Sequence, residues 1–197
     1  MESRQRGNPA GNTNAQVAAN VRTARQAIGM DLRTFSERVK ETGRAMSPSA
    51  LSKIENGERR VDVDDLTVFA YILRTTPPAL LAPAEGASQP TGVPSGQFNH
   101  EEIQVWVRGQ AKFTTEDLAR YWKDEYFSAV SSIHYYENLM MQYTKGRHGK
   151  GNEMHRGTYE ERLASFRARR DAARVRLLAL DPDALPAPRD DTADGWA

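Results

Sequence analysis

The chain has 197 residues, of which 39% are hydrophobic and 27% charged, and its formal net charge is +1. These values are ordinary for a soluble globular protein of one or two domains. The chain has no cysteine, which excludes disulfides, thiol nucleophiles and thiolate metal sites and fits a reducing cytoplasm. No apolar run approaches the roughly 18 residues of a membrane span, and the N-terminus lacks the apolar core of a signal peptide. We therefore expect a cytoplasmic protein without a membrane partner.

The N-terminal part of the chain is predicted to be a flexible arm followed by a small helical bundle. Residues 1–13 are rich in Gly, Asn, Pro and Arg and are predicted to be disordered. Residues 14–83 contain five short helical patterns around one core. The first is Asn14–Ile28, and the second is capped by Asp31. The fourth begins at Asp62, and the fifth is a short helix at Pro78–Leu81.

The third helix has the clearest start and end. Ser47 is an N-cap whose hydroxyl can accept an orphan backbone N–H, and Pro48 fits the first helical position. Leu51 and Ile54 lie three residues apart and face inward, and Gly57 supplies the left-handed residue that ends the helix. The other side chains form a small polar outer face, made of Ser49, Ser52, Lys53 and Asn56. A short helix with such a face suits insertion into the major groove of DNA.

The segment Ser52-Lys53-Ile54-Glu55-Asn56-Gly57 resembles the Ser-x-Ile-Glu-x-Gly signature of the lambda repressor/Cro (Xre) helix-turn-helix family. The resemblance covers roughly residues 17–83 and includes Val21-Arg22-x-x-Arg25 and Leu66-x-x-Phe69-Ala70-x-x-Leu73. It implies a five-helix lambda-repressor-like bundle that binds double-stranded DNA, and an ion pair between Arg25 and Glu55 that clamps the reading helix. The chain departs from the family at Leu32, where a phosphate-contacting Gln is usual, and in the longer Lys40–Met46 turn.

The candidate DNA contacts divide by role. Side chains near the start of the reading helix are predicted to reach base edges, namely Ser49, Ser52 and Lys53. Ser47 and Pro48 cap the same end, where Pro48 could also touch a thymine methyl group. The loop after the helix is predicted to hold phosphates through Asn56, Arg59 and Arg60. Arg33 and Thr34 could bind a neighbouring phosphate with the help of the N-terminus of the second helix. With one long basic side chain on the reading face, specificity is expected to rest partly on DNA shape or dimer spacing.

The C-terminal part is predicted to be helical and to follow a linker. Residues 84–98 are punctuated by Pro, Gly and Ser, as in interdomain linkers. The apolar alternation at 103–107 fits a short strand, and a turn of helix fits nearly as well. Two long amphipathic patterns, 114–143 and 158–180, predict an antiparallel hairpin within a domain of residues 99–180. Because one partner helix does not cover the whole apolar stripe of the other, we expect a homodimer through these helices.

Two alternatives for the C-terminal domain stay open. The segment between the hairpin helices carries a basic cluster, Lys145, Arg147 and Lys150, that could form a second DNA contact. With the arginines of the following helix it suggests a monomer that uses residues 99–180 as a second DNA-binding module. Those arginines are Arg162, Arg167, Arg169, Arg170, Arg174 and Arg176. The other alternative is an antitoxin-like interaction protein that autoregulates its promoter. Residues 181–197 are predicted to be a disordered tail.

No pattern in the chain predicts catalysis or a cofactor. The four histidines, which are His100, His134, His148 and His155, show no metal-ligand spacing. No carboxylate pair, phosphate-binding loop or nucleophile elbow stands out. We expect no catalytic residue, no metal and no cofactor. The sequence therefore predicts an all-α, two-domain transcription regulator that acts on a double-stranded DNA operator in the cytoplasm, associated with the nucleoid. Repression is the expected outcome, and a phage immunity repressor is a special case.

Overall fold

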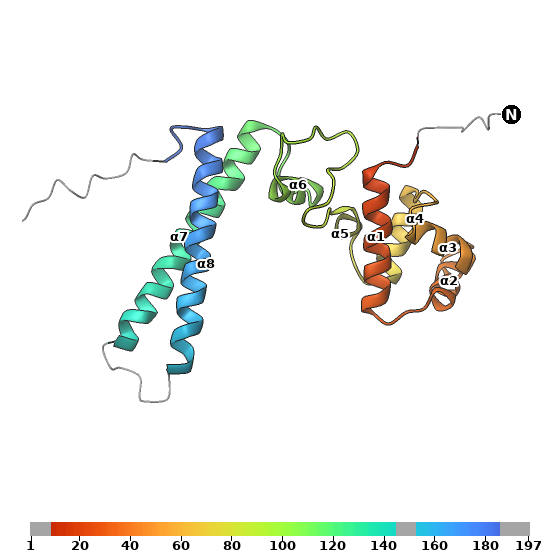
Figure 1. Ribbon diagram of the computed structural model, residues 1–197, viewed down its shortest axis with the longest axis horizontal. Coiled ribbons are helices and arrows are strands. Elements are labelled where there is room, and N and C mark those ends of the chain that lie inside the picture. Colours follow the sequence, from red (N-terminus) through yellow and green to blue (C-terminus); the bar gives the residue numbers. More distant parts are fainter. Residues whose placement is uncertain (1–8, 145–152, 186–197) are drawn as a thin grey trace, which may run out of the picture. The chain divides into compact units, whose positions relative to one another are not determined.

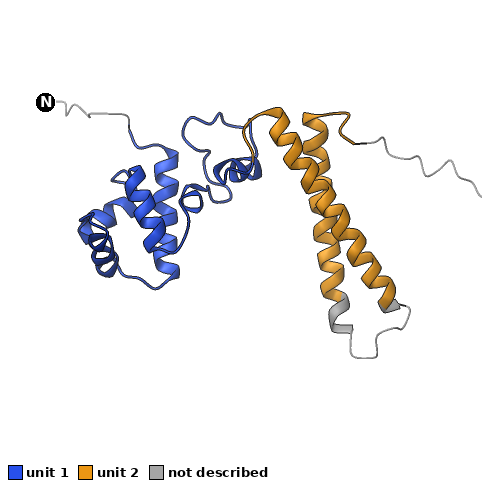
Figure 2. Ribbon diagram, turned by 180° about the vertical axis from the view of Figure 1, so that it is seen from behind, with its two compact units in different colours: residues 1–110 blue, residues 111–197 orange. Residues whose placement is uncertain are grey.

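The computed structural model describes residues 9–144 and 153–185, and the regular structure within them is helical, without strands. The all-α prediction is thus confirmed. The chain divides into two compact units, residues 1–110 and residues 111–197, each of which is described by itself (Figure 2). The helices are α1 (Asn12–Ala27), α2 (Leu32–Glu41), α3 (Pro48–Glu55), α4 (Val63–Ile72), α5 (Pro77–Leu81), α6 (His100–Val107), α7 (Thr115–Thr144) and α8 (Glu153–Leu180). In the described part of the chain, no helix is both long and apolar enough to cross a bilayer.

The short helices of the first unit start at polar side chains that accept backbone N–H groups. Asp31, Ser47 and Asp62 each accept the N–H of the residue three positions later, at 2.7, 3.1 and 2.7 Å. These are the starts that the sequence predicted for α2, α3 and α4. Each such cap stabilises its helix by about 1 kcal/mol. At the other end of α3, Gly57 has the expected left-handed backbone, with φ of 74°.

Helices α1 to α5 pack around one apolar core (Figure 1). Phe35 of α2 and Phe69 of α4 are fully buried, with ring centroids 5.3 Å apart. Leu51 and Ile54, the predicted inward stripe of α3, are fully buried in the same cluster. Burial of a side chain of this size stabilises the fold by about 1.5–3 kcal/mol. The core therefore fixes which face of α3 points outward.

The predicted arm and the predicted linker are partly folded and contact each other. Helix α1 begins at Asn12, so the arm does not extend to residue 13. Thr13 N–H donates to Oγ1 of Thr91 at 3.2 Å, and Thr91 N–H donates to Oγ1 of Thr13 at 2.9 Å. Asn12 Nδ2 donates to the Gln89 carbonyl at 3.1 Å. These bonds join segments almost eighty residues apart, which local composition does not reveal. Residues 1–8 of the arm lie outside the described residues.

The ambiguous segment 103–107 is helical and belongs to the first unit. Helix α6 starts with a capping box, in which Asn99 accepts the N–H of Glu102 at 2.8 Å and Glu102 accepts the N–H of Asn99 at 3.0 Å. This reciprocal pair favours helix over strand. Gln104 Nε2 donates to the Pro83 carbonyl at 2.5 Å, so α6 is tied back to the end of the bundle. The first unit accordingly ends near residue 110 rather than at residue 83.

The second unit is the predicted antiparallel hairpin of α7 and α8 (Figure 1). Trp122 of α7 packs with Ala173 and Leu177 of α8, and all three are buried. Farther along, the ring of Tyr136 stacks on Phe166 with centroids 5.5 Å apart. Pairs of this kind add about 0.5–1.5 kcal/mol to the area that they bury. A two-helix unit of this size has only a thin core.

The start of α8 and the segment that follows the helix differ from the prediction, whereas its end at Leu180 agrees with it. The helix begins at Glu153, five residues earlier than expected, within the segment taken as a loop. Residues 145–152, which include Lys145, Arg147 and Lys150, lie outside the described residues. After α8, Ala184 and Leu185 pack against the cluster around Trp122, so the first residues of the predicted tail are part of the hairpin. The remainder of that tail, from residue 186, is also outside the described residues.

Candidate nucleic-acid interface

Helix α3 presents a small polar surface because its apolar stripe is anchored in the core. Ser49 and Lys53 are exposed and Ser52 is half-buried, all within two turns of the capped N-terminus. Within the described residues, Lys53 has no hydrogen bond or ion pair through its ammonium group, so this cation is available to a ligand. Ser47 and Pro48 are exposed at the same end of the helix. The three side chains assigned to base edges thus share one accessible face.

Arg25 of α1 and Glu55 of α3 form the ion pair that the family resemblance implied. Arg25 Nε lies 2.6 Å from Glu55 Oε1, and Arg25 Nη2 lies 2.9 Å from Oε2, so the contact is bidentate. The side chains are only 12% and 5% exposed. Arg25 Nη1 also donates to the Met30 carbonyl at 2.5 Å. The hydrogen bond to Glu55 raises the pKa of Arg25, and the guanidinium stays charged. Glu55 therefore holds α3 to α1 and is buried in the bundle, away from the outward face of α3.

The loop after α3 is held at both ends. The Lys53 carbonyl accepts the N–H groups of Glu58 at 2.8 Å and Arg59 at 3.1 Å. At the far end of the loop, Asn14 Oδ1 of α1 accepts the N–H of Val61 at 3.0 Å. Arg59, whose N–H is one of these attachments, and the next residue, Arg60, are exposed, as is Asn56 at the helix end. The fold thus presents both predicted phosphate-binding arginines on a short, tethered loop beside the reading helix.

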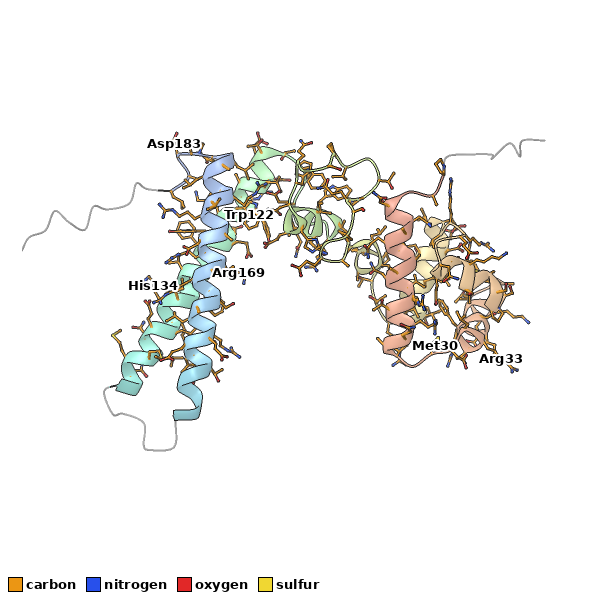
Figure 3. All side chains as sticks on the ribbon, in the orientation of Figure 1. Met30, Arg33, Trp122, His134, Arg169 and Asp183 are labelled. Atoms are coloured by element: carbon orange, nitrogen blue, oxygen red, sulfur yellow. The ribbon has the colours of Figure 1, made fainter. Side chains whose placement is uncertain are left out.

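The start of α2 is less suited to a phosphate than the sequence suggested. Arg33 is 83% exposed at the side chain and reaches into solvent, with Glu37 3.3 Å away (Figure 3). The N–H of Thr34 is already bonded to the Asp31 carboxylate. That bond lowers the pKa of Asp31, so a negative charge occupies this helix end at neutral pH. Leu32, which stands where the family has its Gln, packs against the core. Arg33 is therefore the remaining candidate for binding a phosphate at this helix end.

The longer turn before α3 contains a charge cluster that the sequence reading missed. Arg44 donates to Asp65 at 2.8 Å, to Asp62 at 2.9 Å and to Asp64 at 3.2 Å. The Asp65 side chain is only 4% exposed, and its hydrogen bond raises the pKa of Arg44. The cluster attaches the turn to the N-terminus of α4. One signal was present in the sequence, namely three aspartates within four residues and a single Arg in the long turn.

The arginines of α8 are largely used inside the hairpin. Arg167 pairs with Glu137 at 2.9 Å. Arg169, which is labelled in Figure 3, donates to Glu125 at 2.6 Å. Arg170 pairs with its neighbour Asp171, and Arg162 donates to the Tyr136 hydroxyl at 2.8 Å. A guanidinium that is already paired has less charge to offer a phosphate. These contacts weigh against a second DNA-binding module on α8, and the basic cluster 145–150 is outside the described residues.

No group of three or more histidines and carboxylates in the described residues is arranged to hold a metal ion.

Comparison with known proteins gives one match. A family model described as helix-turn-helix matches residues 9–80, which include α1 to α4 and most of α5. No curated protein and no solved structure matches the chain.

Proposed function

We propose that this protein is a repressor. The premise is the match of residues 9–80 to the helix-turn-helix family model, which supports a DNA-binding transcription regulator of the lambda repressor/Cro (Xre) type. It binds its operator with α3 in the major groove and excludes polymerase from the promoter. Repression of this kind needs no catalytic step and no cofactor. Such a protein acts in the cytoplasm, on the nucleoid. Phage immunity is one setting in which a repressor of this kind would work.

The observation that carries the proposal is the outward face of α3. Lys53 can address guanine O6 and N7, and Ser49 and Ser52 can address a base or a phosphate. Arg59 and Arg60 on the tethered loop can neutralise phosphates on the same side of the unit. Buried Glu55 keeps the helix in place while Arg25 neutralises its charge. Positioning, base contact and phosphate contact are thus supplied by adjacent elements.

A reading face with one long basic side chain gives modest affinity for a single half-site. We propose that the α7–α8 hairpin joins two subunits, so that two weak contacts act together through their high effective concentration. The operator would then be an inverted repeat, with half-site centres separated by a near-integral number of helical turns. Deletion of residues 111–197 should leave a folded first unit that binds the operator far more weakly.

The direct test is selection of bound DNA from a random pool by the full chain, followed by footprinting of the enriched sequence. An inverted repeat protected on one face of the duplex supports a dimeric repressor. An asymmetric site protected beyond the reach of one bundle would support the monomer with a second DNA contact. Binding without any sequence enrichment would contradict the proposal.

The antitoxin-like alternative is tested separately. It requires a partner protein that the hairpin neutralises, with the bundle autoregulating the promoter of both genes. A small toxic protein encoded beside this chain would favour that alternative. A divergent promoter with repeated half-sites would favour the repressor.

A further inference from the structure

The two segments that flank α3 meet at the N-terminus of α4. The turn before α3 comprises residues 42–46, between α2 and the cap of α3. The loop after α3 comprises residues 57–61 and leads directly into Asp62, the N-cap of α4. Arg44, in the turn, donates through Nη2 to the Asp62 carboxylate, at 2.9 Å to Oδ2 and 3.2 Å to Oδ1. One ion pair therefore joins the segment before the reading helix to the segment after it.

The guanidinium of Arg44 uses its nitrogens for three different carboxylates. Besides the bond to Asp62, Nε donates to Asp65 at 2.8 Å and Nη1 donates to Asp64 at 3.2 Å. The side chain of Asp65 is 4% exposed, whereas those of Asp62 and Asp64 are 61% and 78% exposed. The buried carboxylate thus fixes where the guanidinium lies, and Asp62 extends that fixed point to the end of the loop. A planar group with five donors can make these contacts together, which a single ammonium group cannot.

Other contacts hold the turn to α2 and to the core. Ser36 of α2 donates through Oγ to the Met46 carbonyl at 2.5 Å, and the Met46 side chain is buried in the core cluster. Thr42 Oγ1 donates to the Val39 carbonyl of α2 at 2.7 Å. These contacts attach the turn on the side of α2, and Arg44 attaches it on the side of α4.

Base edges and phosphates have a fixed spacing on a DNA duplex, so the side chains that bind them need a fixed spacing too. Lys53 of α3 is the candidate for a base edge, and Arg59 and Arg60 of the loop are the candidates for phosphates. A binding constellation must be held to within about 0.5 Å of its productive geometry. Because Arg44 joins the segments on both sides of α3, it restrains the spacing between these two sets of side chains.

We propose that Arg44 is a positioning residue for sequence recognition, which holds the turn before α3 and the loop after α3 at one point on α4. It acts through Asp62 and Asp65 and does not contact DNA itself. Loss of Arg44 lets α3 move relative to the loop, so phosphate binding persists while the preference for one base sequence falls. The inference rests on the proposed function, because it concerns how the same helix reads its operator.

A role in charge alone predicts a different result. Asp62 and Asp64 are exposed carboxylates close in sequence to Arg59 and Arg60, and negative charge there repels the phosphates of any DNA sequence. If Arg44 only neutralised these carboxylates, its removal would weaken binding to the operator and to random DNA by the same factor. The ratio of the two affinities therefore separates positioning from charge.

The first test measures this ratio by gel-shift titration of the full chain on the selected operator and on random duplex, at one salt concentration. Arg44→Ala should lower the ratio about fivefold or more, which is the discrimination that one good base contact supplies. Arg38→Ala is the matched control and should leave the ratio unchanged, because Arg38 is exposed and pairs with Glu41 of the same helix. Arg44→Lys keeps the charge without the planar fork, so it should bind random DNA as the wild type does but with a lower ratio.

A second pair of variants tests the proposal even if Arg44→Ala fails to fold around the buried Asp65. Asp62→Ser keeps an N-cap for α4 and removes the carboxylate that Arg44 contacts. Glu58→Ser removes an exposed carboxylate from the same loop and is its matched control. Charge alone predicts tighter binding of both variants to every sequence, with an unchanged ratio. The positioning role predicts a lower ratio for Asp62→Ser and the wild-type ratio for Glu58→Ser.

Two results would overturn the positioning role. The first is a wild-type ratio in Asp62→Ser and in Arg44→Lys. The second is a shallower salt dependence of random-DNA binding in Arg44→Ala, of the size expected for Arg59→Ala, because it would make Arg44 a direct phosphate contact.

Hydrogen exchange of the free protein tests the link without DNA. The N–H groups of Thr42 and Gly43 are bonded to carbonyls of α2, so their exchange reports opening of the turn. Asp62→Ser should speed this exchange on the far side of the reading helix, and Glu58→Ser should not. If the wild type prefers no DNA sequence, the repressor is contradicted, and the exchange result alone decides whether Arg44 links the two segments. Unchanged exchange of Thr42 and Gly43 in Asp62→Ser would overturn the link.

Discussion

Arg25 and Glu55 form a bidentate ion pair across thirty residues of sequence, and both side chains are almost completely buried. The pair joins α1 to the C-terminal turn of α3. Glu55 is in the last turn of α3, so its bond to Arg25 determines the orientation of α3 relative to α1. The hydrogen bond from Arg25 to the Met30 carbonyl extends the same connection to the turn before α2.

Removal of one member of this pair should lower the free energy of unfolding. Glu55→Ala leaves the Arg25 guanidinium buried without its carboxylate, and we expect a loss of about 3 kcal/mol in the free energy of unfolding. Glu58→Ala, in the exposed loop that follows, is the control and should change stability by less than about 0.5 kcal/mol. Urea denaturation followed by circular dichroism measures both. Equal, small losses would show that the pair does not clamp α3.

Base-edge and phosphate contacts should differ in their dependence on DNA sequence. Lys53→Ala should weaken operator binding by about 1–3 kcal/mol and relax the preference at one base pair. Arg59→Ala and Arg60→Ala should weaken binding to all sequences alike and make the salt dependence shallower. Gel-shift titrations on the operator and on single-base variants separate the two. A uniform loss on every sequence for Lys53→Ala would contradict its assignment to a base.

The folded DNA-binding unit should extend to residue 110. A fragment of residues 1–110 retains the exchange of hydrogen bonds between Thr13 and Thr91 and the contact of Gln104 with Pro83. A fragment of residues 1–83 loses all three bonds and should be less stable by about 1 kcal/mol for each. Thermal unfolding of the two fragments makes the comparison. Indistinguishable unfolding temperatures would show that residues 84–110 do not stabilise the bundle.

A point substitution can isolate the contact between α1 and the segment after α5. Thr91→Val keeps the shape of the side chain and removes the hydroxyl that accepts the N–H of Thr13, so we expect a loss of about 1 kcal/mol in the free energy of unfolding. Ser95→Ala, in the same segment and exposed, should have no measurable effect. The two variants should be compared by urea denaturation of the full chain.

The cap of α2 should make stability depend on pH. The Thr34 N–H lowers the pKa of Asp31 from its ordinary value of 3.8. A depressed carboxyl pKa contributes stability above the unfolded value, and this contribution is lost as the pH falls through the folded value. Asp31→Asn keeps a capping side chain without the titration. The wild type should therefore be more stable than Asp31→Asn at neutral pH, and the difference should vanish below the folded pKa of Asp31. A constant difference across the acid range would contradict this account.

Features set by neighbouring residues were predictable from the sequence. Asp31, Ser47 and Asp62 cap their helices through a bond to a residue three positions away, so their role is local. The inward stripe of α3 follows from the 3.6-residue period of any helix. The ion pair of Arg25 and Glu55 could be predicted because the sequence around both residues resembles the lambda repressor/Cro family. Together these signals determined the fold of α1 to α5 and the face of α3 that remains outside.

Contacts between distant segments were decided only by the tertiary structure. Composition marked residues 84–98 as a linker, yet Thr91 bonds to Thr13 because folding brings the start of α1 to that segment. Arg44 gains its three aspartates only when the long turn folds onto α4. Arg167 and Arg169 of α8 contribute to a basic pattern in the sequence, but in the fold they pair with Glu137 and Glu125 of α7. A hydrogen bond or ion pair depends on atoms within a few ångströms, and sequence patterns report such proximity only along one helix or turn.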